Sequence, residues 1–209
     1  MPFGREDSLE DHMTRRIHMS FSIPIVFLAI GANAANLIKN GSFETPLVPV
    51  GSYETFSTGQ TFSGWKVVGA AGNVGIVSGQ LTQNGFSFPA EAGKQWLDLT
   101  GLSNTRTGVA QTFASTPGRA YTLTFWVGNV YDPQGIFGVS STVIVRVNGK
   151  QVYKATNSRG KGKATQVWEK FVTTITATSS KTTIAFINDD PSNDTENGLD
   201  AITVVPLND

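Results

Sequence analysis

The feature that most constrains the fold is the way turn residues divide this chain. Glycine and asparagine recur at short intervals between stretches rich in Val, Ile, Thr and aromatic residues. This pattern is typical of an all-β protein, in which turn residues separate short strands. No stretch keeps the apolar period of an amphipathic helix. The sequence therefore predicts many short antiparallel strands.

The strands can be assigned residue ranges from this punctuation. They are predicted at Asn36–Phe43, Gly64–Val68, Asn73–Val77, Gln95–Leu99, Gly108–Phe113, Tyr121–Val130, Ser140–Val147, Gln151–Ala155, Val167–Ala177, Thr182–Ile187 and Leu199–Val205. The clearest turn is Asn148-Gly149, because Asn-Gly supplies the two positive-φ residues of a type I′ hairpin. The strands on either side of it should therefore pair.

Alternation along one strand separates a buried face from an open one. Tyr121, Leu123, Phe125 and Val127 point to one side, and Trp126 points to the other. Such one-sided strands are satisfied when two antiparallel sheets pack face to face. We therefore expect an all-β fold, a two-sheet antiparallel jelly-roll sandwich.

The first 34 residues have the pattern of a targeting segment. A basic opening after Met13 leads into the apolar run 21–31 and then Ala32-Asn33-Ala34. This run is shorter than the roughly 20 residues of a membrane span, and the small residues suit signal peptidase. We expect residues 1–34 to be a leader, of which 1–12 are an upstream extension or a mis-called start. Residues 35–209 should form a single secreted domain, extracellular or periplasmic, without a membrane span.

The composition of the segment after this leader excludes several kinds of chemistry. Both histidines, His12 and His18, lie in the leader, and the chain has no cysteine. Nucleophile systems that use His or Cys, and zinc sites of imidazole or thiolate, are therefore excluded. The net charge is close to zero, so nothing indicates a nucleic-acid partner. Two-carboxylate glycoside chemistry stays open on Glu54, Glu91, Asp98 and Glu169, but no catalytic residue is predicted.

Six ordered segments carry a resemblance to a known family. They are Asn36-Leu-Ile-Lys-Asn-Gly-Ser-Phe-Glu44, Ser63-Gly-Trp65, Gln95-Trp-Leu-Asp-Leu99, Gly108-Val-Ala-Gln-Thr-Phe113, Pro117-Gly-Arg-Ala-Tyr-Thr-Leu-Thr-Phe125 and Gly198-Leu-Asp-Ala-Ile-Thr-Val204. Over about residues 36–205 the chain resembles the galactose-binding-like jelly rolls of the domain-of-unknown-function family six-four-two and the related choice-of-anchor C proteins. The resemblance implies an extracellular sandwich associated with cell-wall polysaccharide.

The same resemblance implies a metal site. In similar calcium-bearing jelly rolls, the acid of the opening motif and the aspartate of the last strand meet at one end of the sandwich. Here those residues are Glu44 and Asp200, whose carboxylates suit a hard cation such as calcium. The alternative is that both make ordinary hydrogen bonds at strand ends. A structural calcium ion is the one cofactor that the resemblance suggests.

The acidic run 188–197 is a second place where a cation could bind. It lacks the ligand spacing and the glycine of an EF-hand loop. We interpret it as a solvated loop.

Sugar recognition needs flat aromatic faces with polar groups beside them. Trp126 is the best candidate because it faces away from the core, and Asn129, Tyr131 and Asp132 follow it. The alternative is that Trp126 packs beneath a covering loop. The loop aromatics Phe86, Phe88 and Phe137 either line a cleft or cap the sandwich.

Three classes of function follow. The first is a non-catalytic module that binds a polysaccharide or glycan of a cell wall or extracellular matrix. The second is an extracellular protein-interaction or structural surface protein, and the third is a polysaccharide-cleaving enzyme. The resemblance and the outward-facing aromatics favour the first.

Overall fold

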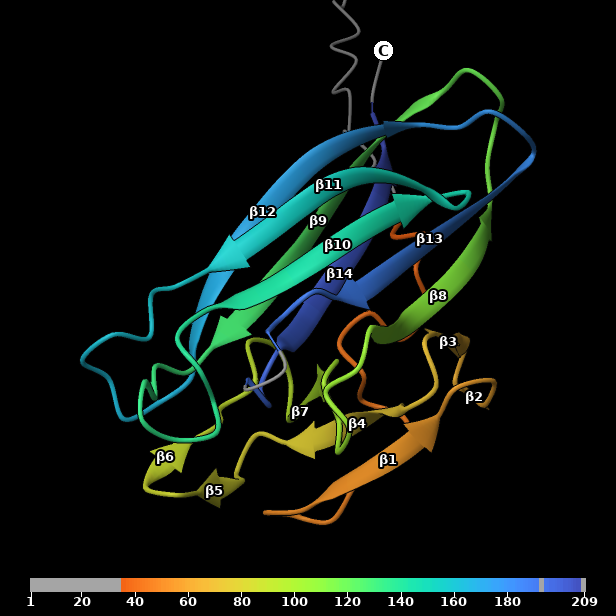
Figure 1. Ribbon diagram of the computed structural model, residues 1–209. Coiled ribbons are helices and arrows are strands. Elements are labelled where there is room, and N and C mark those ends of the chain that lie inside the picture. The colour runs from red at the N-terminus through yellow and green to blue at the C-terminus, as the bar shows by residue number, and fades with distance from the viewer. Residues whose placement is uncertain (1–34, 192–193, 208–209) are drawn as a thin grey trace, which may run out of the picture. The chain divides into compact units, whose positions relative to one another are not determined.

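Two antiparallel sheets make up the fold (Figure 1). The computed structural model describes residues 35–191 and 194–207. The predicted leader, residues 1–34, lies outside the described residues. Within the described ranges all regular structure is β, and none of it is a helix long and apolar enough to cross a membrane.

The strands divide between the two sheets without following chain order. Sheet A has the order β1-β4-β7-β14-β9-β12, sheet B has the order β11-β10-β13-β8-β3-β2, and β5 and β6 pair separately. The strands are β1 (Tyr53–Ser57), β2 (Thr61–Phe62), β3 (Trp65–Gly69), β4 (Asn73–Ser78), β5 (Thr82–Gln83), β6 (Phe86–Ser87), β7 (Gln95–Asp98), β8 (Thr107–Ala114), β9 (Ala120–Asn129), β10 (Ser141–Val147), β11 (Lys150–Asn157), β12 (Val167–Thr176), β13 (Lys181–Asn188) and β14 (Gly198–Pro206). In Figure 1, strands β10, β11 and β13 lie in front of β9, β12 and β14 as a separate layer.

The predicted alternation fills the space between the sheets. Tyr121, Leu123, Phe125 and Val127 of β9 are all buried in the main core, as the period of two requires. Trp65 joins this core, and its indole N–H donates to the carbonyl of Asn40 at 3.0 Å. Each large side chain buried in this way contributes about 1.5–3 kcal/mol to stability. The jelly-roll sandwich is confirmed.

The hairpin at Asn148-Gly149 is also confirmed. Strands β10 and β11 pair antiparallel with Val147 opposite Lys150. Asn148 has φ 49° and Gly149 has φ 82°, which are the left-handed conformations that the type I′ turn needs. All the other predicted strands after the first are present, with bounds that differ by a few residues.

The predicted first strand, Asn36–Phe43, is wrong. The segment lies alongside β14, but it does not form a regular ladder of backbone hydrogen bonds with that strand. The Asn36 side chain takes the place of one backbone acceptor, because its Oδ1 accepts from the Val204 N–H at 2.9 Å. Asn40 and Phe43 then take positive φ values of 51° and 54°. Left-handed residues interrupt an extended strand, so the segment is a series of bends.

Candidate functional site

The face of sheet A turned away from sheet B carries the candidate site, and we call it the outer face. The strand register places one row of residues across this face, from β1 to β12: Thr55, Gly75, Asp98, Gly198, Gly128 and Trp168. The glycines make room for the Trp168 ring. A Cβ on Gly128 or on Gly198 would lie 3.0 Å from atoms of that ring, closer than packed side chains approach.

A second apolar cluster lies on this face, separate from the core between the sheets. The ring centroids of Trp168 and Trp96 are 6.0 Å apart, and Trp96 stacks on Phe88 at 6.1 Å. Phe137 meets Phe88 edge-on at 5.1 Å. The indole N–H groups of Trp96 and Trp168 donate to the carbonyls of Phe88 and Pro89, at 3.0 and 2.8 Å. These contacts hold the segment around Phe88 against the sheet.

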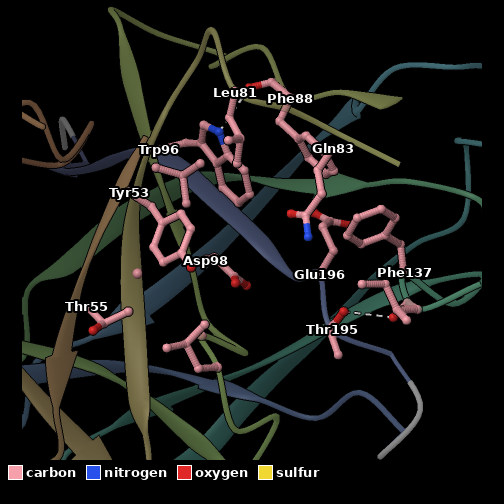
Figure 2. A pocket seen from close by; sticks show the side chains of 15 residues that line it. Tyr53, Thr55, Leu81, Gln83, Phe88, Trp96, Asp98, Phe137, Thr195 and Glu196 are labelled. Atoms are coloured by element: carbon pink, nitrogen blue, oxygen red, sulfur yellow. Dashed lines mark hydrogen bonds between the residues drawn. The ribbon is translucent and has the colours of Figure 1, made fainter. Parts of the chain in front are cut away.

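A pocket of about 230 Å³ opens beside this cluster (Figure 2). Its lining comprises Tyr53, Thr55, Gly75, Val77, Leu81, Gln83, Phe88, Trp96, Asp98, Gly101, Leu102, Ile136, Phe137, Thr195 and Glu196. Gly75 contributes to the hollow, because even a Cβ added there would approach no atom closer than 3.8 Å. Tyr53 is 47% exposed and offers an aromatic surface at the rim. Figure 2 shows the Asp98 carboxylate between Tyr53 and Glu196.

The Asp98 carboxylate is held in place through one of its two oxygens. Oδ1 accepts from the backbone N–H and the hydroxyl of Thr100, at 2.9 and 2.7 Å, and from the Asn197 N–H at 3.3 Å. Oδ2 accepts no hydrogen bond of ordinary geometry from the described residues, although the nearby Gly101 N–H lowers the pKa of the carboxyl. Burial raises the pKa of Asp98 to about 6, against the lowering effect of the Thr100 hydrogen bonds. Asp98 therefore presents a fixed carboxylate with one acceptor oxygen unused.

Three further acids lie behind Asp98, on the segment before β14. Glu196 is buried, and its Oε2 accepts from the Val130 N–H at 2.9 Å while its Oε1 accepts from the Gly198 N–H at 3.0 Å. Burial raises the pKa of Glu196 well above its ordinary value. Burial also raises the pKa of Asp194 to about 8, and that of Asp190 to about 10 with a contribution from the Asp194 charge.

The interpretation of the run 188–197 as a solvated loop is wrong at its described ends, 188 and 194–197, while residues 192–193 lie outside the described residues. Asp194 and Glu196 are 2% exposed, and Asn197 is fully buried. The Asn197 side-chain amide donates to the Thr142 carbonyl and to Asn188 Oδ1, at 2.7 and 2.8 Å. These two bonds tie the segment to β10 and β13 of sheet B, and the Asn197 N–H donates to Asp98 in sheet A. Composition alone did not show this, because the burial follows from long-range contacts.

The predicted sugar-binding residues lie next to the pocket rather than in it. Trp126 is half-buried on the outer face, with Asp200 and Lys170 as its cross-strand neighbours. Tyr131 and Asp132 follow in a half-buried loop. Asn129 is fully buried, and its side chain bonds the Val130 carbonyl, Ser141 Oγ and the Gly160 N–H. Asn129 is thus a structural residue with no surface for a ligand.

The predicted calcium ligands meet at one loop. Glu44 Oε1 accepts from the Lys94 and Gln95 N–H groups at 2.8 and 2.9 Å. Asp200 Oδ2 accepts from the N–H groups of Glu91 and Ala92, at 2.9 and 3.0 Å. Burial, aided by the Glu44 charge, raises the pKa of Asp200 to about 7.

Two carboxylates that repel each other at one loop fit one side of a hard-cation site. Among the described residues, no group of three acidic, His or Cys side chains comes together as a set of metal ligands. The loop backbone or water would have to complete the coordination. Calcium at Glu44 and Asp200 stays a proposal.

Sequence reasoning missed several lining residues. Tyr53 lies in β1, which was not predicted, and Gln83 lies in a short loop strand. Glu196 fell in the run interpreted as solvated. Alternation places Asp98 on the same face as Trp96, opposite Leu97, but it does not show that this face lines a pocket. Phe88 and Phe137 do line a cleft, as one of the two interpretations held.

Comparison with solved structures gives an alignment with a TM-score above 0.5, which shows the same fold, and several weaker ones. A cyclase from Fischerella sp. TAU aligns with a TM-score of 0.53 at 18% identity, over 83% of this chain and 98% of that chain. A family 35 carbohydrate-binding module from Clostridium thermocellum aligns with a TM-score of 0.44 at 12% identity, over 73% and 97%. The CBM22-1 xylan-binding domain of Paenibacillus barcinonensis Xyn10C gives 0.43 at 15% identity, over 76% and 97%.

Comparison of the sequence with known proteins gives one family and no individual protein. None of the curated proteins matches this sequence. The model of the family described as "Protein of unknown function (DUF642)" matches residues 36–205, the same span over which the six ordered segments occur. The chain therefore belongs to the DUF642 family.

Proposed function

We propose that this chain is a secreted, non-catalytic module that binds a carbohydrate of a cell wall or extracellular matrix through the outer-face pocket. One observation carries the proposal: a half-exposed aromatic ring, Tyr53, stands beside a fixed carboxylate, Asp98, over a hollow floor. A flat ring packs against the C–H face of a pyranose, and a fixed acceptor pairs with its hydroxyl groups. The secreted location rests on the predicted leader.

Trp126 supplies a second contact in this proposal. It pairs with Asp200 of β14, two residues along that strand from Gly198, the partner of Asp98. A polysaccharide longer than the pocket can therefore reach it, with Tyr131 and Asp132 in the loop beyond. Asn129 is not part of this surface because it is buried.

We propose a non-catalytic role because of the hydrogen bonds that the two pocket acids, Asp98 and Glu196, already accept. Glycoside hydrolysis needs two carboxyl groups free to act on the bond between two sugars. Both oxygens of Glu196 accept hydrogen bonds from the backbone. Of the two acids that line the pocket, only Asp98 keeps an oxygen without a hydrogen bond of ordinary geometry from the described residues. The pair is therefore better suited to holding a ligand than to proton transfer.

The test is calorimetric titration with a panel of neutral, amino-bearing and uronic-acid oligosaccharides. We expect at least one to bind, and Tyr53→Ala to weaken that binding by about tenfold through loss of the stacking surface. Val172→Ala is the matched control, because Val172 is 53% exposed on β12 and lies outside the pocket lining. Unchanged affinity in Tyr53→Ala would refute the assignment of the pocket. Release of shorter sugars during incubation would refute the non-catalytic role.

A further inference from the structure

The pocket has charged groups of one sign only. Its lining contains the carboxyls of Asp98 and Glu196 and no Lys, Arg or His. Asp190 and Asp194 lie behind them, close enough for the Asp98 charge to raise the pKa of both. Because burial keeps the three acids on the segment before β14 largely protonated near pH 6.5, the negative charge that a ligand meets there is that of Asp98.

The cations that contact this acidic segment are engaged elsewhere. Arg106 and Lys154 both bind Asp189, which does not line the pocket; the Lys154 Nζ lies 2.9 Å from Asp189 Oδ2. These two cations are therefore paired with Asp189 and do not neutralise the carboxyls that line the pocket. The negative charge in the pocket has no compensating group among the lining residues.

Asp98 offers a ligand one of its two carboxylate oxygens. Three donors fix its Oδ1, and its Oδ2 takes no hydrogen bond of ordinary geometry from the described residues. The Asp98 carboxylate and the Tyr53 ring line the same pocket, as Figure 2 shows. A cationic donor placed there would form a charge-assisted hydrogen bond, which is roughly twice as strong as a neutral one. A uronic-acid carboxylate would meet a like charge instead.

We propose that the pocket selects an amino sugar, whose free ammonium group binds Asp98 Oδ2 while the pyranose ring lies against Tyr53. This inference rests on the proposed function and names its class of ligand. A neutral N-acetyl sugar of the same shape keeps the stacking surface but lacks the charge. The ammonium should therefore account for a measurable part of the affinity.

The experiment titrates the full domain with three oligosaccharides of equal length, made of glucosamine, N-acetylglucosamine or galacturonate, at pH 6.5 and low salt. We expect the glucosamine oligomer to bind about ten- to hundredfold more tightly than the N-acetyl oligomer. Galacturonate should bind most weakly. Salt should reduce the difference, because charge interactions at a solvated site are screened.

Variants separate the charge from the shape of the site. Asp98→Asn keeps an oxygen for the Thr100 and Asn197 donors but loses the negative charge. It should remove the preference for glucosamine, so that the glucosamine and N-acetylglucosamine oligomers bind with affinities within about twofold of each other. Glu54→Gln, an exposed acid on β1 outside the lining, should leave the preference unchanged.

A pH profile of the wild type gives a second measurement if Asp98→Asn does not fold. The groups that face Asp98 are Glu196, Asp194 and Asp190, with Tyr53 at the rim. The preference for glucosamine should fall below pH 6 as Asp98 takes up a proton. It should fall again above about pH 8, where an amine of α-amino type loses its proton.

The outcomes distinguish the two claims. Equal binding of the glucosamine and N-acetyl oligomers, or tighter binding of galacturonate, would overturn the inference and leave the proposed function standing. If no sugar of the wider panel binds, the proposed function fails and the inference fails with it.

Discussion

Individual carboxyls are the unusual residues of this protein. Asp190, Asp194 and Glu196 lie within one short segment, and burial raises the pKa of each. A carboxyl with a raised pKa binds its proton more tightly in the folded state than in the unfolded state. The unfolded chain therefore releases protons at a lower pH than the folded protein does.

This difference fixes the sign of the pH dependence. Between about pH 4 and pH 8 the folded state holds more protons than the unfolded state, so the free energy of unfolding should fall as pH rises. Each such carboxyl contributes up to about 1.4 kcal/mol per pH unit over its own window. For Asp194 the window runs from its ordinary pKa of 3.8 to about 8. Urea unfolding at pH 5, 6.5 and 8 with a chelator present measures this directly.

Asp194→Asn identifies the residue responsible. The variant keeps an oxygen that can accept from the Glu196 N–H, at 3.2 Å in the wild type, but has no charge to bury. It should be more stable than the wild type at pH 8 and show a flatter profile. Glu54→Gln, which changes an exposed acid, should keep the wild-type profile. A wild type whose stability rises steadily from pH 5 to pH 8 would contradict the account.

At the scale of elements, alternation predicted the long strands well. The residues of β9 and β10 that a period of two assigns to the interior are buried in the main core. Strands β1 and β2 were missed because they are short and irregularly buried. The segment after Asn36 was predicted as a strand, but side-chain hydrogen bonds and left-handed residues replace the ladder there.

The proposed calcium ligands, Glu44 and Asp200 of β14, both accept hydrogen bonds from backbone N–H groups of residues 91–95. The Glu44 charge also helps to raise the pKa of Asp200. A bound cation would relieve that repulsion and stabilise the folded state. We expect calcium to raise the melting temperature relative to chelator. Asp200→Asn should remove the response, and Glu54→Gln should keep it.

The contradicting result for calcium is equally direct. An identical melting temperature with calcium and with chelator would remove Glu44 and Asp200 as metal ligands. Their hydrogen bonds to the loop would then be their whole role, as the alternative interpretation of the sequence held.

At the scale of the whole molecule, the two faces of sheet A have different uses. The inner face packs on sheet B, while the outer face carries a second aromatic cluster and the pocket. The sequence indicated which residues point outward, such as Trp126. It did not indicate which outward residues lie together, because β1, β4, β7 and β14 are neighbours in space and not along the chain.

The most direct test of the pocket follows the indole N–H signals of the four tryptophans by NMR during titration with a binding oligosaccharide. Trp96 lines the pocket and Trp65 is buried between the sheets. We expect the Trp96 signal to move with ligand concentration, with a smaller change at neighbouring Trp168, while Trp65 stays fixed. A Trp96 signal that does not move at saturating ligand, with Trp126 alone responding, would contradict the account and place the binding surface beyond Asp200.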